Sequence, residues 1–349
     1  MKPFAAGLLT LFCTAALAAD EEPAGTVAPL FASHEIVSVT ITAPFKQIMF
    51  DRFEDEEKQG KFVYTDLESG KEVSLDIGIR TRGRFRRQKE VCAFAPLRLN
   101  FRKTKGTLLA KSDKLKLVTH CRTGSNKYEQ AVLKEYIAYR ILNSITDWSF
   151  RARLLKMRYV ESTTGEEVAS TWAFLIEHDD QVAKRIGMKV DDSERTTVDA
   201  IDGAHTNLVS MYQYLIGNTD FSPIKGAPGE PCCHNYVLMG NDTVSISVPY
   251  DFDVTGLVAP PHAVPNPRFG LASVKQRLYR GRCANNSRLE TTFQTYRDKQ
   301  QDIYDLVNNM EGLSKGERKR TVRYIDDFYK IINSQRQVNH RIVKKCLGK

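Results

Sequence analysis

Side chains that could do chemistry gather in one stretch of the second half of the sequence. Asp220 lies in a loop after an expected helix, Asn235 precedes a short apolar run, and Asp251 and Asp253 follow a second apolar run. Carboxylate and amide oxygens suit Mg²⁺ when water and phosphate complete its coordination. A carboxylate can also accept a proton. The stretch therefore indicates a site that binds a divalent cation or handles protons.

Each of these residues also has a purely structural interpretation. Asp220 could form a turn at the end of the helix, and Asn235 could satisfy backbone groups where a strand begins. Asp251 and Asp253 are harder to explain in this way, because two like charges beside apolar neighbours are costly without a cation or hydrogen-bond donors. Asp220 and Asp251 could also serve glycoside hydrolysis, but that hypothesis leaves Asn235 unexplained.

Positive charge is in moderate excess and is partly clustered. The sequence has 51 Lys and Arg residues against 42 Asp and Glu residues, a net charge of +9. Arg80 and Arg82 open a cluster that runs to Arg87, which is either a solvated turn or a cradle for phosphate. The surplus suits an anionic ligand, and we expect no nucleic-acid partner.

The first 18 residues have the pattern of a secretory signal. One lysine precedes a short apolar run that ends in small residues, which predicts cleavage between Ala18 and Ala19. No later segment reaches the ~18 consecutive apolar residues that span a bilayer. We therefore expect an exported protein, periplasmic or extracellular, with no transmembrane segment.

Cysteine usage agrees with export. Removing the signal takes Cys13 away and leaves an even number of cysteines, which suits disulfides in an oxidising compartment. Proximity in the sequence favours a bond between Cys92 and Cys121. It also favours a bond from Cys232 or Cys233 to Cys283 or Cys346.

The pattern of apolar residues predicts an α+β chain in two parts. A flexible lead-in over residues 19–33 precedes a β-rich part over residues 34–178, with one long helix at Tyr128–Ile145, where apolar residues recur at four-residue steps. Residues 179–349 are expected to be mostly helical with a small β-insert. The polar segment 177–180 is the expected hinge between two lobes, with a ligand cleft between them.

Five short motifs resemble the CotH-like atypical protein kinases, a family of kinase-like fold among secreted and spore-coat proteins. They are Ile79-Arg80-Thr81-Arg82-Gly83, Pro96-Leu97-Arg98-Leu99-Asn100-Phe101, Asn218-Thr219-Asp220, His234-Asn235-Tyr236 and Pro249-Tyr250-Asp251-Phe252-Asp253. The resemblance covers residues 75–260 and implies a two-lobed protein-kinase-like fold. It departs from the kinase pattern in the long Pro/Gly-rich segment before Asn235 and in the absence of a clear glycine-rich phosphate loop.

The resemblance also implies roles for the acidic stretch. Asp251 would be the principal Mg²⁺ ligand, Asn235 the second ligand, and Asp220 the catalytic base. Asp253 is a reserve ligand, because residues two apart in an extended segment point to the same face. Phosphoryl transfer consists largely of positioning and charge neutralisation, which explains the need for these residue types.

The sequence offers several candidates for the cation that would hold the phosphates of ATP. Arg98 occupies the position expected for the lysine of a kinase, and Arg80, Arg82 or Lys116 could act instead. An arginine can hold phosphate oxygens in a bidentate fork. Glu135, or Glu129 on the same helix, would orient the cation.

The sequence therefore predicts a secreted, Mg²⁺-dependent phosphotransferase that acts from ATP on a hydroxyl of a protein or glycan. The alternative is a catalytically inactive kinase-like envelope protein that binds an anionic ligand or partner. Saturable, Mg²⁺-dependent nucleotide binding would distinguish the first from the second.

Overall fold

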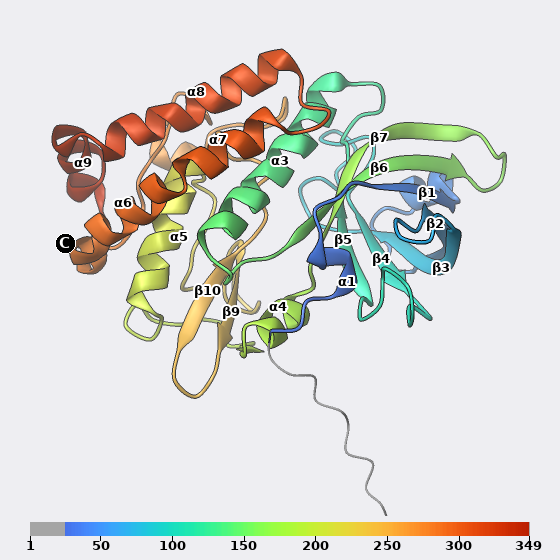
Figure 1. The fold of residues 1–349 in the computed structure, drawn as a ribbon, viewed down its shortest axis with the longest axis horizontal. Coiled ribbons are helices and arrows are strands. Elements are labelled where there is room, and N and C mark those ends of the chain that lie inside the picture. The colour runs from blue at the N-terminus through green and yellow to red at the C-terminus, as the bar shows by residue number, and fades with distance from the viewer. Residues whose placement is uncertain (1–24, 349) are drawn as a thin grey trace, which may run out of the picture.

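Alternation of apolar and polar residues produces seven strands in the first half of the chain. The computed structural model describes residues 25–348. The seven strands are β1 (Val37–Ala43), β2 (Lys58–Thr65), β3 (Glu72–Thr81), β4 (Leu97–Phe101), β5 (Lys114–Val118), β6 (Ala152–Glu161) and β7 (Glu167–Ile176). They lie together on the right of Figure 1.

These strands close into a barrel in the order β1-β2-β3-β4-β5-β7-β6. The β6–β7 hairpin joins the two ends of the sheet, because β7 pairs with β5 and β6 pairs with β1. The β1–β6 pairing is parallel, and the other pairings are antiparallel. The prediction of a two-lobed protein-kinase-like fold is therefore wrong, since the β-rich half is a closed mixed barrel. Alternation of apolar and polar residues predicts individual strands, but it does not show which edge strands pair to close a barrel.

Aliphatic side chains fill the barrel interior. Ile41, Ile79, Leu99, Leu117 and Leu155 come from five different strands, and each is fully buried. A barrel of this size has an interior just wide enough for such side chains. The barrel is consequently a packed core, and ligands must bind outside it.

Most of the helices lie in the second half of the chain, although helical residues are less than half of it. The helices of the described residues are α1 (Pro29–Ala32), α2 (Phe45–Phe50), α3 (Asn126–Ile145), α4 (Asp179–Arg185), α5 (Gly203–Ile216), α6 (Leu289–Asp298), α7 (Gln300–Asn308), α8 (Lys315–Ile332) and α9 (Gln335–Arg341). Short 3₁₀ turns occupy Pro267–Phe269, Cys283–Arg288 and Val343–Lys345. Helix α1 lies within the expected lead-in, and its Leu30 and Phe31 are buried.

Helix α3 begins close to the predicted residue and ends at the predicted one. Its buried side chains join a hydrophobic core with α5, α6, α7 and α8, and this core also takes in Phe174 of β7. Figure 1 shows α3 between the barrel and the other helices. Helix α3 therefore packs on both sides, against strands β6 and β7 of the barrel and against helix α7.

A small antiparallel sheet lies beside these helices. Its strands are β8 (Lys189–Val190), β9 (Tyr236–Gly240) and β10 (Ser245–Pro249), in the order β10-β9-β8. The hairpin of β9 and β10 is the predicted β-insert, and it turns at Asn241, whose Oδ1 accepts from the Thr243 and Val244 amides. The acidic motifs flank this hairpin.

Three disulfides tie the described chain together. The predicted bond between Cys92 and Cys121 is confirmed. The expected link from Cys232 or Cys233 to Cys283 or Cys346 is wrong, because Cys232 bonds to Cys233 and Cys283 bonds to Cys346. The backbone N–H of Cys283 donates to Leu347 O, so the C-terminal segment folds back beside Cys283 and brings Cys346 to it.

No helix within residues 25–348 is long and apolar enough to cross a membrane. The predicted signal segment lies outside the described residues.

Candidate functional site

A cleft of about 880 Å³ separates the outer wall of the barrel from the segments around the β9–β10 hairpin. Eight of the nine predicted site residues line it: Arg80, Arg82, Arg98, Lys116, Asp220, Asn235, Asp251 and Asp253. The cations come from the barrel, and the acidic residues come from the opposite side. The cleft thus has two walls of opposite charge.

Strand geometry explains the cationic wall. In β4 the side chains of Leu97, Leu99 and Phe101 point into the barrel, so Arg98 between them points outward. Arg80 of β3 pairs with Arg98, and Arg98 pairs with Lys116 of β5. Side chains that are directly opposite on neighbouring strands lie on the same face. The register therefore places three cations in a row across the barrel.

The cations differ in what they already contact. Arg80 Nη1 lies 2.7 Å from Asp55 Oδ1, and Lys116 Nζ lies 3.0 Å from Asp179 Oδ1. Lys116 also lies 4.5 Å from the centre of the Tyr250 ring. The side chains of Arg82 and Arg98 make no hydrogen bond or ion pair with any described residue, and Arg82 Nε is buried without a partner. These two arginines are the cations most available to an anion.

Asn235 and Asp251 lie at the same end of the β9–β10 hairpin. Asn235 immediately precedes β9, Asp251 follows β10, and the Tyr250 amide donates to Asn235 O at 3.0 Å. Both residues have left-handed backbone conformations, with φ of 56° and 62°. Such conformations are uncommon in residues other than glycine and cluster at functional sites. Tyr139 Oη contacts the Asp251 amide at 3.0 Å, which links this end of the hairpin to α3.

The Asp251 carboxylate is in an unfavourable environment for a negative charge. Burial and the neighbouring Asp253 raise its pKa to about 6, although Arg82, Arg86 and Lys116 oppose the shift. Neither carboxylate oxygen accepts a hydrogen bond or ion pair from residues 25–348. Within residues 25–348, Arg82, Arg86 and Lys116 therefore act on this carboxylate through their charges and not through a direct contact.

Asp220 meets Asn235 because the intervening Pro/Gly-rich segment loops out. Ser222 and His234 form an isolated β-bridge that closes the loop. Asn235 Nδ2 donates to Asp220 O at 2.7 Å and to Asp220 Oδ2 at 3.3 Å. His234 Nε2 lies 2.8 Å from Asp220 Oδ1. These contacts fix the direction of the Asp220 carboxylate.

The Asp220–His234 pair is an ion pair when the histidine is protonated. The hydrogen bond with His234 lowers the pKa of Asp220, and the same bond raises the pKa of His234. His234 lies in one of the five sequence motifs, but the sequence predicts no role for it in the site. Its proximity to Asp220 depends on the β-bridge between residues distant in sequence, for which the sequence has no signal.

This pair gives a titration that can be measured. We expect the pKa of His234 in the native protein to lie above its ordinary 6.5 and to fall in Asp220→Asn, because the charged partner is lost. The charged pair contributes to the free energy of unfolding at pH values where Asp220 is ionised and His234 is protonated. This contribution disappears as the pH rises through the pKa of folded His234. NMR titration of the histidine rings measures the pKa of His234, with the other histidines as internal controls. An unchanged His234 titration in Asp220→Asn would contradict the pairing.

Glu135 lies behind the cleft and not on its wall. This residue of α3 is 3 % exposed, and burial together with Asp253 raises the pKa of its carboxyl well above the ordinary value. Arg86 and Arg82 act in the opposite direction. Glu135 is thus near two arginines of the barrel side but is not placed to contact a ligand in the cleft.

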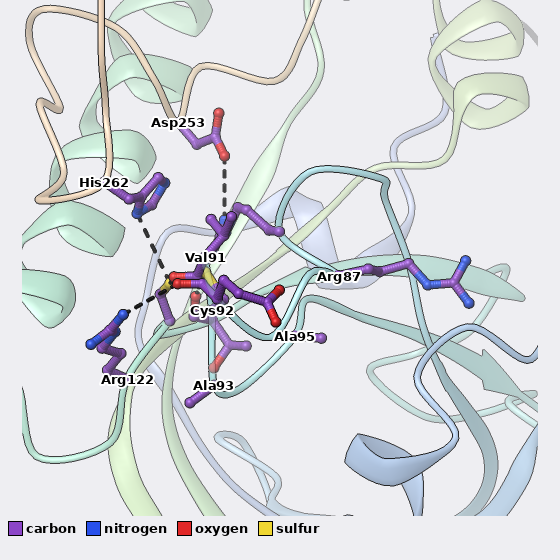
Figure 2. The surroundings of a disulfide bond; sticks show 12 residues. Arg87, Val91, Cys92, Ala93, Ala95, Arg122, Asp253 and His262 are labelled. Atoms are coloured by element: carbon purple, nitrogen blue, oxygen red, sulfur yellow. Dashed lines mark hydrogen bonds and ion pairs between the residues drawn. A yellow bond between two sulfur atoms is a disulfide. The ribbon is translucent and has the colours of Figure 1, made fainter.

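The arginine loop, residues 83–87, precedes the segment that carries the Cys92–Cys121 disulfide. Figure 2 shows Asp253 and His262 above the loop that carries this bond. Arg86 Nη2 donates to Thr119 O at 2.8 Å, and Arg86 Nη1 lies 3.6 Å from Asp253 Oδ2. Arg86 is therefore a second residue of the site that the sequence did not distinguish from its neighbours, and it connects the two walls.

The cleft offers few oxygens that could be ligands of a metal ion. Within residues 25–348, the His, Cys, Asp and Glu side chains bring three ligand atoms within 4.8 Å of one another only at Cys92, Cys121 and His262, where both thiols form the disulfide. The cleft offers instead the free Asp251 oxygens and Asn235 Oδ1, which accepts no hydrogen bond from the described chain. Magnesium is commonly held by one or two side chains, with water and phosphate as its other ligands.

Comparison with known proteins assigns no family to this arrangement. No protein-family model matches the sequence, and no curated protein matches it significantly. The function must therefore be argued from the cleft.

Proposed function

We propose that the protein is an exported, Mg²⁺-dependent phosphotransferase that transfers a phosphoryl group from ATP to a hydroxyl of a protein or glycan. The observation that carries the proposal is the pair of oppositely charged walls: Arg82 and Arg98 line the same cleft as Asp251 and Asn235, and within residues 25–348 neither these guanidinium groups nor these side-chain oxygens have a hydrogen-bond or ion-pair partner. A triphosphate needs both cations and a metal site.

The cationic wall would bind the phosphates. Arg82 and Arg98 have free guanidinium groups, and a guanidinium holds phosphate oxygens in a bidentate fork. Lys116 is held by Asp179 and by the Tyr250 ring, so its charge has a fixed position. Fixed charges stabilise a transition state without reorganisation.

Asp251 and Asn235 would hold the magnesium ion, with Asp253 as a neighbouring carboxylate. When bound, Mg²⁺ neutralises charge on the transferring phosphate. The raised pKa of Asp251 supports this assignment, because a carboxylate that is destabilised as an anion is stabilised by a cation.

Asp220 would orient the acceptor hydroxyl. Its lowered pKa keeps the carboxylate ionised at neutral pH, and His234 with Asn235 fixes its direction. A carboxylate that aligns a hydroxyl and accepts its hydrogen bond satisfies the requirement of phosphoryl transfer for positioning.

The sequence motifs support a relationship to CotH-like proteins, which we propose for the motifs alone and not for the scaffold. Three disulfides support export, because such bonds persist in oxidising compartments.

Titration of the protein with ATP, with and without Mg²⁺, tests the proposal. We expect saturable binding that requires Mg²⁺, that weakens at least about tenfold in Asp251→Ala, and that is unchanged in Asp199→Ala, where an exposed carboxylate lies away from the cleft. Transfer of the terminal phosphate should be lost in Asp220→Asn, although ATP still binds. Calorimetry and a labelled-phosphate assay measure the two quantities.

The competing function is non-catalytic binding of an anion by the cationic wall, and Arg82 and Arg98, which make no ion pair with a described residue, favour it. It predicts binding of ATP that ignores Mg²⁺ and Asp251 but fails in Arg98→Ala. That result would remove the phosphotransferase and leave an anion-binding protein.

A further inference from the structure

The mouth of the cleft has an apolar surface that phosphate binding does not use. Phe85 of the arginine loop is 49 % exposed, and Val264 is 73 % exposed; both line the cleft. Large hydrophobic side chains with this exposure are few among residues 25–348. We call Phe85 and Val264, with the His262 ring beside them, the apolar rim.

The apolar rim is built on a rigid base. The His262 ring stacks on Tyr128 of α3, with centroids 5.8 Å apart and planes 11° apart, and Phe85 lies 6.2 Å from the same His262 ring. Hydrogen bonds from Arg86 to Thr119 O and from Arg87 to Arg52 O hold the arginine loop, and Pro260, Pro261 and Pro265 restrict the backbone around His262. The exposed side chains therefore have fixed positions, which lowers the entropic cost of binding.

Positive charge surrounds the apolar rim. Burial, Arg86 and Arg122 lower the pKa of His262 to about 4, so the ring stays neutral while both arginines act on it. The Arg84 guanidinium contacts the Glu230 carboxylate across the mouth, and the Arg84 side chain remains 79 % exposed. A partner that covers the apolar rim therefore meets an electropositive border.

We propose that the apolar rim docks the acceptor, and that the acceptor is an acidic polypeptide segment that presents an apolar side chain near the hydroxyl to be modified. This deepens the proposed function and rests on it for the transfer step. A polypeptide combines the two required features, since one apolar side chain can cover Phe85 and Val264 while flanking carboxylates face the arginines. A neutral saccharide has no carboxylates to place against the arginines.

Fluorescent Ser/Thr peptides test the proposal with the full-length chain. The panel contains peptides with Leu or Phe between acidic residues, the same peptides with Ala or with Lys, and a uronate oligosaccharide. We expect the acidic apolar peptides to bind best and to lose at least about tenfold in affinity in Phe85→Ser/Val264→Ser. The matched control is Leu67→Ser, because Leu67 is also 49 % exposed but does not line the cleft.

The outcomes separate this proposal from the function on which it rests. Equal peptide binding by the double variant, or binding of the oligosaccharide alone, overturns the docking proposal, as does the absence of binding by every peptide. ATP titrations of the same variants report on the phosphate site. Peptide binding without Mg²⁺-dependent ATP binding would retain the docking surface and remove the phosphotransferase.

Discussion

Replacing Glu177 with alanine is expected to destabilise the protein by about 3–5 kcal/mol, because it leaves a buried guanidinium without its counter-ion. Arg185 Nε and Nη2 lie 3.0 Å and 2.9 Å from the two Glu177 oxygens, and the two side chains are 4 % and 1 % exposed. Arg185 also donates to Asp147 O and Ser149 O. The pair thus joins the end of β7, helix α4 and the loop after α3.

Glu167 provides a matched control at the other end of β7. Its carboxylate lies 2.7 Å from Arg158 Nε, but both side chains are about half exposed. An exposed pair contributes about 0–1 kcal/mol, so Glu167→Ala should change stability little. Urea unfolding of both variants measures the difference. Equal midpoints would show that the buried pair contributes no more to stability than the exposed one. If the unpaired charge of Arg185 causes the loss, Glu177→Leu/Arg185→Met should recover stability.

Replacing Asp251 with asparagine is expected to increase the free energy of unfolding at neutral pH by about 1–3 kcal/mol. The folded state raises the pKa of Asp251 from 3.8 to about 6. Between these values the folded protein binds a proton more tightly than the unfolded chain, so stability falls as the pH rises through this window and stays lower above it. Asparagine removes the charge and therefore the loss.

The same substitution should remove stabilisation by magnesium. Added Mg²⁺ with ATP should raise the unfolding midpoint of the unsubstituted protein and leave that of Asp251→Asn unchanged, because ligands stabilise the state that binds them. Denaturant titrations across the acidic to neutral range give both results, with Asp199→Asn as the exposed control. If Asp251→Asn were less stable than the unsubstituted protein at neutral pH, the attraction of Arg82, Arg86 and Lys116 for the Asp251 carboxylate would exceed the cost of burying its charge.

Local patterns in the sequence predict the elements, and long-range pairing decides the architecture. Four-residue spacing identifies α3, and alternation identifies β1 and the β6–β7 hairpin. The parallel pairing of β1 with β6 converts the expected open lobe into a barrel, and no local pattern specifies it. The expected hinge over residues 177–180 includes Glu177, which is buried by Arg185. Polarity alone does not distinguish an exposed turn from a buried ion pair.

Eight of the nine residues chosen from the sequence line one cleft, and their roles stay predictions. Its acidic residues occur where strands begin and end, and motif spacing points to them. The row of Arg80, Arg98 and Lys116 follows from the register between strands, and the contact of His234 with Asp220 follows from a loop closure. Neither feature is encoded by neighbouring residues, so the sequence suggests the candidates without showing which of them meet.

The filled interior of the barrel limits which parts of the protein can move when a ligand binds. Close-packed side chains resist compression. The strands that carry Arg98 and Lys116 therefore form a rigid wall of the cleft. Any adjustment to a bound molecule must then arise in the segments opposite, among them the proline-rich loop between Asp220 and Asn235, which contains no regular helix or strand. The fit to a ligand would be one-sided, with the cationic wall fixed and the adjustment confined to this loop.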